Sequence, residues 1–106
     1  MGWCEVARYK LDDDELTAVL TKLPDWKIKE NKLHKIYKFG SFAQAMGWMM
    51  SVAIYADKMD HHPEWSNVYN RVTVNLVTHD MGNAISNWDI ELAEKMDEFA
   101  SQFVWQ

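Results

Sequence analysis

The chain has 106 residues, of which 48% are hydrophobic and 25% are charged. This length favours a single domain over residues 1–106, and the composition excludes a disordered chain. Sixteen acidic and eleven basic residues give a net charge of −5, which argues against direct binding of nucleic-acid phosphates. The one cysteine, Cys4, cannot form a disulfide within the chain, so the fold does not depend on oxidation.

The start of the chain shows no helical or strand period, and we expect residues 1–10 to form an N-terminal arm. This segment also lacks the apolar run of a signal peptide. The longest apolar stretch, residues 42–56, is too short to span a bilayer. The sequence therefore predicts a soluble protein of the cytoplasm or the nucleus, with no membrane partner.

The first predicted elements are a helix and a β-hairpin. Asp12 or Asp13 is expected to cap a helix that Pro24 ends. The apolar residues of this helix recur at helical spacing, at Leu16, Val19, Leu20 and Leu23. The hairpin that follows is expected to have strands over 26–30 and 33–39 and a turn at 31–32.

The second helix is expected over residues 41–59, with Ser41 as its N-cap. It carries two apolar stripes, one made of Phe42, Met46, Met49, Met50 and Ala53 and one made of Ala45, Trp48, Val52, Tyr55 and Met59. One stripe can cover a sheet, but the second then needs another partner, because a helix that is apolar nearly all round is a buried helix. We favour an oligomer interface over a single wide stripe with some exposed side chains.

A second hairpin is expected after Pro63. Its strands are predicted over 67–69 and 72–79, with the turn at 70–71. The second strand alternates cleanly, which places one set of its side chains in the core: Val72, Val74 and Leu76. His79 ends this strand in the opposite phase, so it should not be a core histidine.

The last helix begins after Ser86, because a capping residue followed by Asp89 three positions later forms a capping box. Its apolar stripe is Trp88, Leu92, Met96, Phe99 and Phe103. The elements thus follow the order α-β-β-α-β-β-α. Antiparallel hairpins with helices on one face predict a two-layer α+β fold.

Three histidines are candidates for chemistry. His61 and His62 are adjacent and follow Asp60, and the strand that returns from this region can bring His79 near the pair. Asp57 and Asp60 lie three positions apart and therefore on one side of the helix end. Because imidazole titrates near the pH of the cell, such a cluster can donate one proton and accept another.

Two other interpretations stay open from the spacing alone. A His-His-Pro turn can simply follow a helix end, where the helix dipole favours a histidine cation. A metal site is the weakest interpretation, since no cysteine lies nearby and adjacent histidines rarely bind one ion. Trp65 and Tyr69 could stack on a flat ligand, although core packing is the simpler explanation for each. The four glycines never group into a phosphate loop.

The residues around the histidines form a set of motifs. They are Asp57-Lys58-Met59-Asp60-His61-His62-Pro63-Glu64-Trp65, Asn67-Val68-Tyr69-Asn70, residues 72–76, Thr78-His79, and Asp89 with Leu92-Ala93. Together they closely resemble the pterin-4a-carbinolamine dehydratase family, and the similarity extends from the first helix to about Phe99. The combination of Asp-His-His-Pro with a later Thr-His is specific.

The resemblance implies a four-stranded antiparallel sheet with three helices on one face. It implies a hydro-lyase that removes water from 4a-hydroxytetrahydrobiopterin to give quinonoid dihydropterin, in the recycling of tetrahydrobiopterin. The pterin is the substrate, and neither a metal nor another cofactor is implied. Homodimers that pair into homotetramers through the helix over 41–59 are also implied, which suits its two apolar stripes.

The resemblance also implies roles for individual residues. His61 and His79 would act as general acids toward the 4a-hydroxyl, one for each face of the pterin, and His62 would bind the substrate and assist proton transfer. Both an acid and a base are needed, because the hydroxyl leaves when protonated and N5 must lose its proton. The implied substrate-binding residues are Asp57, Asp60, His61, His62, Pro63, Thr78, His79, Asp80, Met81 and Asp89.

Two departures from the family pattern affect the site. Asp57 stands where the family usually has Glu, so this carboxylate has a shorter reach. The loop over residues 80–86 carries a short insertion, and Asp89 matches the pattern once that gap is allowed.

An alternative function is that of a non-catalytic interaction protein. Some family members bind and stabilise the dimer of a homeodomain transcription factor in the nucleus, and that role would use the same apolar helix. A third hypothesis is a fold that has lost catalysis, against which the presence of all three histidines argues.

Overall fold

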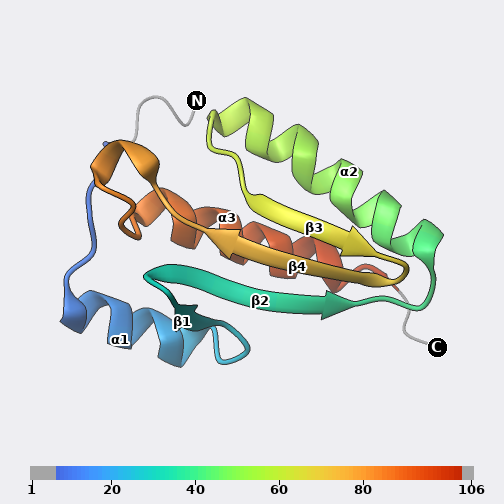
Figure 1. Ribbon diagram of the computed structural model, residues 1–106, viewed down its shortest axis with the longest axis horizontal. Coiled ribbons are helices and arrows are strands. Elements are labelled where there is room, and N and C mark those ends of the chain that lie inside the picture. The colour runs from blue at the N-terminus through green and yellow to red at the C-terminus, as the bar shows by residue number, and fades with distance from the viewer. Residues whose placement is uncertain (1–6, 104–106) are drawn as a thin grey trace.

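The structure is a computed structural model that describes residues 7–103 (Figure 1). Its elements are α1 (Asp13–Lys22), β1 (Lys27–Lys29), β2 (Lys32–Lys38), α2 (Phe42–Met59), β3 (Glu64–Val68), β4 (Arg71–Leu76), the short 3₁₀ helix η2 (His79–Met81) and α3 (Asn87–Ala100). The predicted order α-β-β-α-β-β-α is confirmed. Of the predicted arm, residues 7–10 are described, whereas Cys4 and the rest of residues 1–6 lie outside the described residues.

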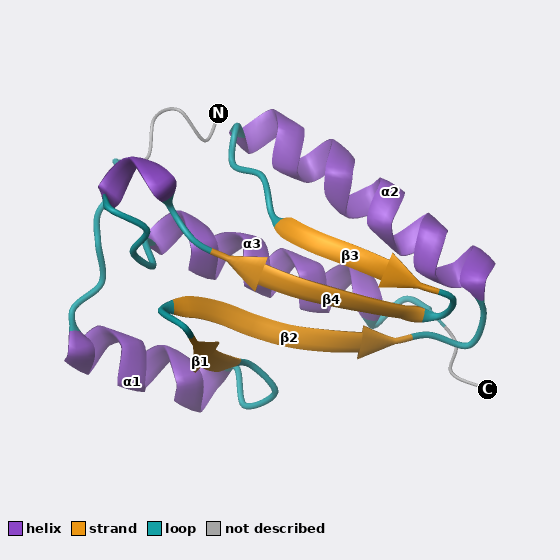
Figure 2. Ribbon diagram, viewed as in Figure 1, coloured by secondary structure: helices purple, strands orange, loops and turns teal. Residues whose placement is uncertain are grey.

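The four strands form one antiparallel sheet in the order β1-β2-β4-β3. Leu33 pairs with Leu76 and Tyr37 with Val72, so these side chains share one face. The helices cover that face, and Figure 2 shows α3 crossing behind the strands. The opposite face stays open: Ile36 is 52% exposed and Val68 69%. The prediction of a two-layer α+β fold with three helices on one face is confirmed.

Side chains cap each helix as the sequence predicts. Asp12 accepts the backbone N–H of Glu15 at the start of α1, and Ser41 accepts that of Gln44 in α2. Ser86 and Asp89 form the capping box of α3. These bonds satisfy backbone donors that have no partner within the helix.

The turns lie one residue earlier than predicted. Lys29 pairs with Lys32, which leaves Glu30 and Asn31 as the two central residues, both left-handed with φ of 53° and 64°. Such central residues suit the right-handed twist of a two-residue hairpin. In the second hairpin the turn is at Tyr69-Asn70.

The second hairpin also differs from the prediction at both ends. β3 starts at Glu64, earlier than the predicted 67–69, and β4 ends at Leu76. His79 therefore lies in η2 and not on the strand. The alternating pattern continues past Leu76, but the backbone of Thr78 pairs with Ala84 in the following loop, which ends the ladder with β2 and β3.

The two stripes of α2 have different environments. The buried stripe consists of Ala45, Trp48, Val52, Ala56 and Met59. Ala56 thus takes the place of the predicted Tyr55, which is only partly buried. The outward stripe contains Phe42, Met46, Met50 and Ile54, which are 49%, 36%, 64% and 56% exposed. The sheet therefore covers one stripe only, and an oligomer interface on the other stripe stays a prediction.

Aromatic rings fill the space between α2 and the sheet. Trp48 is fully buried, with ring centroids 4.4 Å from Tyr37, 5.1 Å from Phe39 and 6.0 Å from Trp65. Its indole N–H donates to the carbonyl of Met96 at 3.0 Å, which also ties α2 to α3. A buried indole needs such a partner for its polar atom.

Asp97 on α3 accepts hydrogen bonds from three side chains in the first half of the chain. Its carboxylate accepts the indole N–H of Trp26 at 3.1 Å, the ammonium of Lys35 at 2.8 Å and the hydroxyl of Tyr37. Burial, followed by the hydrogen bond and charge of Asp97, raises the pKa of Tyr37 far above its ordinary value. The phenol therefore stays protonated in the folded state.

Stability should fall above about pH 10, because Tyr37 then loses its proton only in the unfolded chain. Above about pH 10 the folded state binds more protons than the unfolded chain. Each further unit of pH therefore lowers the free energy of unfolding by up to about 1.4 kcal/mol. Tyr37→Phe should show a shallower loss than the wild type in urea titrations between about pH 9 and pH 11. Equal slopes for the two proteins would contradict this assignment.

Candidate functional site

The end of α2 places the adjacent histidines. Asp60 caps the helix in the left-handed conformation, with φ of 55°, a conformation that Asp tolerates better than most residues. The N–H of His61 then donates back to the carbonyl of Ala56 at 3.1 Å. This tight reversal directs His61 and His62 toward the end of β4.

His61 is held in the interior by a buried carboxylate. The ring is 6% exposed, and its Nε2 lies 2.5 Å from Oδ1 of Asp89, which is fully buried. A carboxylate only accepts hydrogen bonds, so Nε2 carries the proton between them. The ring also meets Trp88 in a T-shaped contact at 5.9 Å.

The second oxygen of Asp89 completes a small buried network. Oδ2 accepts the hydroxyl of Thr78 at 2.8 Å and the backbone N–H of Ser86 at 2.9 Å. The hydroxyls of Thr78 and Ser86 lie 2.6 Å apart, and because Thr78 donates to Asp89, Ser86 donates to Thr78. Asp89 thus joins the end of α2, the segment after β4 and the start of α3.

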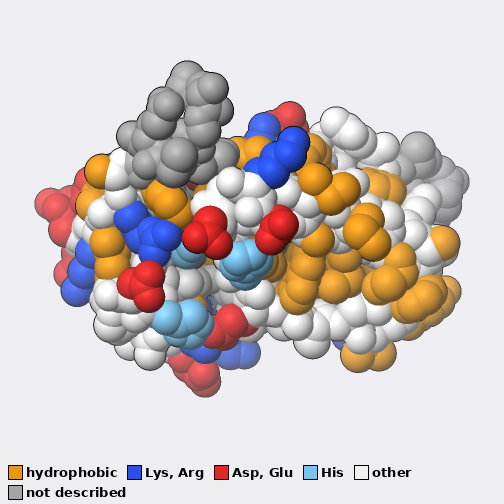
Figure 3. Space-filling view, turned by 90° about the horizontal axis from the view of Figure 1, so that it is seen from above, with side chains coloured by type: hydrophobic (Ala, Val, Ile, Leu, Met, Phe, Trp, Pro, Cys, Tyr) orange, Lys and Arg blue, Asp and Glu red, His pale blue; other side chains and the backbone are white. Residues whose placement is uncertain are grey.

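The predicted site residues line two neighbouring cavities. The first, of about 300 Å³, is lined by Arg8, Asp60, His61, His62, Val77, Thr78, His79 and Asp80. We call it the histidine cavity. The second, of about 460 Å³, is lined by Ala53, Ile54, Ala56, Asp57, His62, Pro63 and Trp65. His62 lines both, whereas Met81 and Asp89 line neither. Figure 3 shows histidines among acidic and basic side chains, beside a hydrophobic area.

His62 and His79 have more open environments than His61. The side chain of His62 is 58% exposed, and its Nε2 lies 3.4 Å from the carboxylate of Asp57. His79 is 65% exposed, with Nε2 at 3.0 Å from Glu64 and Nδ1 at 2.7 Å from Asn83. The fourth histidine, His34, lies apart from the cavity, buried on the sheet against Asn75.

Glu64 is a charged partner that the sequence interpretation missed. Its other oxygen accepts from Lys32 at 2.7 Å. That hydrogen bond, together with the charges of Lys32 and His79, lowers the pKa of Glu64, so this group is a carboxylate at neutral pH. Its place directly after Pro63 in the motif was the available signal, but nothing local indicated that it meets His79.

The arm contributes Arg8, which also escaped the sequence interpretation. Its guanidinium lies 4.1 Å above the ring of Trp88 and 3.1 Å from the carboxylate of Asp80. Asn87 fixes the arm by accepting the N–H of Tyr9 at 2.8 Å and donating to the carbonyl of Ala7 at 3.0 Å. The arm has no period, so a contact across more than seventy residues was not visible in the sequence.

The two aromatic residues that could stack on a flat ligand lie in different places. Trp65 packs near Trp48 and lines the second cavity, whereas Tyr69 is 65% exposed at the hairpin turn, at the opposite end of β3. Within residues 7–103, no three His, Cys, Asp or Glu side chains are grouped so that they could hold a metal ion. None of the helices in that range has both the length and the apolar character for crossing a membrane.

Replacing Asp89 should test the buried network. Asp89→Asn places an amide N–H₂ group against donors, so we expect a loss of roughly 3 kcal/mol in the free energy of unfolding. Asp57→Asn changes an exposed carboxylate beside a histidine and should stay within about 0.5 kcal/mol of the wild type. Urea unfolding measures the free energy of unfolding of both variants. A similar loss in the two would contradict a stabilising role of the network around Asp89.

Known proteins share both the sequence and the fold. A family profile described as pterin 4 alpha carbinolamine dehydratase matches residues 9–99. A protein of Jannaschia sp. (strain CCS1), provisionally named a pterin-4-alpha-carbinolamine dehydratase, is 48% identical over 95 residues, which cover 86% of this chain and 96% of that protein. A protein of Solibacter usitatus with the same provisional name is 45% identical and covers 87% of this chain and 96% of its own length.

A solved structure agrees with these relatives. It is described as a transcriptional coactivator/pterin dehydratase from Brucella melitensis, and it is 39% identical with a TM-score of 0.83, covering 87% of this chain and 99% of its own. The family match over residues 9–99 spans nearly all of the described residues, including both hairpins and the three histidines of the cavity. The chain therefore belongs to the pterin-4-alpha-carbinolamine dehydratase family.

Proposed function

We propose that this protein removes water from a 4a-hydroxytetrahydropterin by histidine general acid/base catalysis. The observation that carries the proposal is the meeting of His61, His62 and His79 on one cavity, in a chain of this family. The three histidines come from two segments of the chain, before β3 and after β4. A cavity of about 300 Å³ has the size of a small-molecule site.

His61 is suited to proton exchange at one defined atom. Because Nε2 donates to Asp89, Nδ1 is the ring nitrogen that can exchange a proton with a ligand. The carboxylate fixes the tautomer and the orientation of the ring, and it stabilises the positive charge that forms when the ring gains a second proton. This arrangement supports a general-acid role for His61 toward the 4a-hydroxyl.

His79 and His62 complete the proposed chemistry. His79 would protonate the hydroxyl from the other face of the pterin, and His62, which lines both cavities, would bind the substrate and assist the proton that leaves N5. The C4a–O bond breaks, the hydroxyl leaves as water, and C4a forms a double bond with N5. The pair His62 and Asp57, 3.4 Å apart, is consistent with orientation of the imidazole by the shorter carboxylate.

The remaining assignments follow the family. We propose that the pterin edge meets Asp60, Pro63, Thr78, Asp80 and Met81, that Asp89 acts through His61, and that the reaction serves tetrahydrobiopterin recycling without a further cofactor. Thr78 lines the cavity while its hydroxyl donates to Asp89. A cytoplasmic or nuclear location and a single domain over the whole chain stay predictions.

Substituting each histidine should separate the roles. We expect His61→Ala and His79→Ala each to lower the rate of dehydration of a freshly prepared 4a-hydroxytetrahydropterin by about 100-fold. His62→Ala should lower this rate too. The measurement is the absorbance change on dehydration, with the uncatalysed rate subtracted.

His34→Gln is the matched control, because it changes the remaining histidine outside the cavity. Its rate per folded protein should equal that of the wild type. A wild-type rate no higher than the uncatalysed one, in a folded protein, would exclude the dehydratase proposal.

A second candidate function is a protein–protein role. The Brucella structure is described as a transcriptional coactivator as well as a dehydratase, and the outward stripe of α2 offers an apolar surface. We propose that this stripe forms the homodimer or homotetramer contact and that a transcription-factor partner would compete for it. The two roles exclude each other at one surface, although they can occur in one protein.

A charge on the outward stripe should disrupt the assembly. Met50 is 64% exposed, so Met50→Glu should leave the fold intact and shift the protein to a smaller species in light scattering after gel filtration. Ile36→Glu places the same charge on the open face of the sheet and should retain the wild-type mass. A smaller mass for both variants, or for neither, would argue against an interface at α2.

A further inference from the structure

The N-terminal arm brings a cation to the histidine cavity. Arg8 lines this cavity together with the three histidines and the carboxylates of Asp60 and Asp80. Among the described residues that line it, Arg8 is the one lysine or arginine. Its side chain is only 24% exposed, although it comes from the start of the described chain. The proposed function leaves this side chain without a role.

Hydrogen bonds hold the arm on both sides of Arg8. The backbone N–H of Tyr9 donates to the side-chain oxygen of Asn87 at 2.8 Å, and the amide group of Asn87 donates to the carbonyl of Ala7 at 3.0 Å. The backbone N–H of Asn87 donates to the carbonyl of Tyr9 at 3.1 Å. The position of Arg8 is therefore fixed relative to the start of α3.

The guanidinium group is also oriented at its end. Its central carbon lies 4.1 Å from the centroid of the Trp88 ring, and its Nη1 donates to Oδ2 of Asp80 at 3.1 Å. A guanidinium carries several N–H donors in one plane and no acceptor. Among the described residues, Asp80 takes one of these donors. The others can therefore bind an oxygen of a ligand in the cavity.

The pair of Arg8 and Asp80 is complementary to one edge of a pterin. The pyrimidine ring of a pterin has an amide edge, where N3–H donates and the C4 carbonyl accepts. Such an edge needs an acceptor and a donor side by side, because its two hydrogen bonds run parallel. Asp80 is an acceptor whose side chain is 84% exposed, and Arg8 is a donor 3.1 Å away from it. The pair thus matches the edge in chemistry and in spacing.

The charges around the pair favour a neutral ligand. The carboxylate of Asp80 offsets the charge of Arg8, and Asp60 adds a second carboxylate to the cavity lining. A phosphate or carboxylate group of a ligand would meet these negative charges as well as the guanidinium. The amide edge of a pterin carries no net charge, so it fits this part of the cavity better than an anion does.

We propose that Arg8 is a substrate-binding residue that donates to the C4 carbonyl of the pterin, while Asp80 accepts from N3–H. This inference deepens the proposed dehydratase function and rests on it for the identity of the substrate. It makes the N-terminal arm a part of the site. Arg8 takes no part in the proton transfers, so its loss should affect substrate binding more than the chemical step.

Binding of 7,8-dihydrobiopterin to the full chain tests the inference without turnover, because this compound keeps the amide edge and lacks the 4a-hydroxyl. Arg8→Met removes the donors and keeps an unbranched apolar stem beside Trp88. By isothermal titration calorimetry we expect about 10-fold weaker binding to this variant, the effect of one charge-assisted hydrogen bond. An unchanged affinity, or no binding to the wild type, would overturn the inference.

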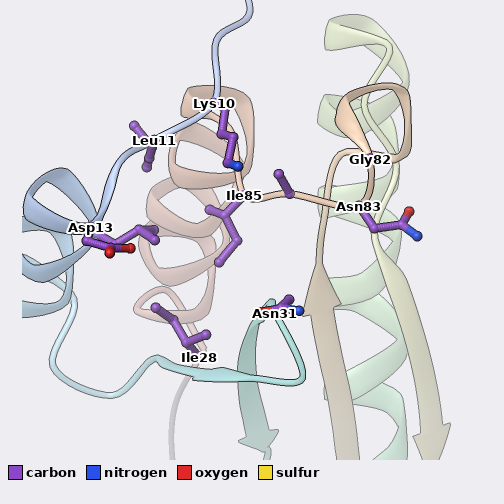
Figure 4. A pocket seen from close by; sticks show the side chains of 10 residues that line it. Lys10, Leu11, Asp13, Ile28, Asn31, Gly82, Asn83 and Ile85 are labelled. Atoms are coloured by element: carbon purple, nitrogen blue, oxygen red, sulfur yellow. The ribbon is translucent and has the colours of Figure 1, made fainter.

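Lys10→Met is the matched control, because it removes the same charge from the same arm. Figure 4 shows Lys10 among the side chains around a separate cavity of about 290 Å³, and Lys10 does not line the histidine cavity. Its affinity for 7,8-dihydrobiopterin should equal that of the wild type. An equal loss in both variants would mean that the charge of the arm acts at a distance, which would overturn the assigned contact.

The carbonyl stretch of the bound ligand reports the contact itself. With 7,8-dihydrobiopterin labelled with ¹³C at C4, isotope-edited infrared difference spectra isolate this one vibration. A hydrogen bond from a guanidinium lowers its frequency, so we expect a higher frequency in Arg8→Met than in the wild type and in Lys10→Met. The same frequency in all three proteins would show that Arg8 has a structural role only and would overturn the inference.

Steady-state kinetics separates binding from chemistry. Arg8→Met should raise KM for the 4a-hydroxytetrahydropterin by about 10-fold, with a smaller change in kcat. A fall in kcat with an unchanged KM would mean that Arg8 acts on the chemical step, contrary to the inference.

Release of the arm provides a second variant that leaves Arg8 in place. Asn87→Ala removes the two side-chain hydrogen bonds to the arm, so it should weaken the binding of 7,8-dihydrobiopterin. In the Arg8→Met background the same substitution should have no further effect. A further loss in that background would show that Asn87 acts independently of Arg8, which would overturn the part assigned to the arm.

These measurements distinguish the inference from the proposed function. If the wild type binds 7,8-dihydrobiopterin but does not accelerate dehydration, the proposed function fails, and the affinities and carbonyl frequencies still decide the role of Arg8. If the wild type accelerates dehydration and Arg8→Met keeps its KM and affinity, the inference alone fails.

Discussion

The fully buried carboxylate of Asp89 constrains the whole site. A charge without water is stable only when it is paired and hydrogen-bonded, and this one meets His61, Thr78 and the backbone N–H of Ser86. Each donor belongs to a different segment: the turn after α2, the extension of β4 and the start of α3. The segments cannot separate without leaving the charge unpaired, so the geometry around His61 is fixed by a requirement of folding.

The three histidines differ in how tightly the protein holds them. His61 is buried against one carboxylate. His79 is exposed, with Nδ1 2.7 Å from Asn83 and Nε2 3.0 Å from Glu64, and His62 is exposed with one long contact to Asp57. Adjacent positions in the sequence thus produce different environments, because His61 points inward at the helix end and His62 outward. The proposed role of His61 as a proton donor with a fixed tautomer depends on this difference in burial.

Local patterns were enough to predict the caps, the core face of β4 and the order of elements, since each depends on residues a few positions apart. Local patterns did not reveal that His79 leaves the strand, because its alternation continues past Leu76. The partners of the histidines were also hidden: Asp89 was expected at the substrate, Glu64 was overlooked, and Arg8 reaches the site from an arm without a period. These contacts join distant segments, and spacing along the chain carries no information about them.

The double duty of Asp89 links helix integrity to the site. The same oxygen that accepts from Thr78 also caps the first turn of α3. Helix ends usually fray in brief local openings, well before the rest of a protein unfolds. Here fraying of the first turn of α3 would break the hydrogen bond between His61 and Asp89 and leave the carboxylate unpaired. The start of this helix should therefore unfold only when the core unfolds. The site and the fold should therefore melt in one cooperative event, without a partly unfolded species in which the cavity survives.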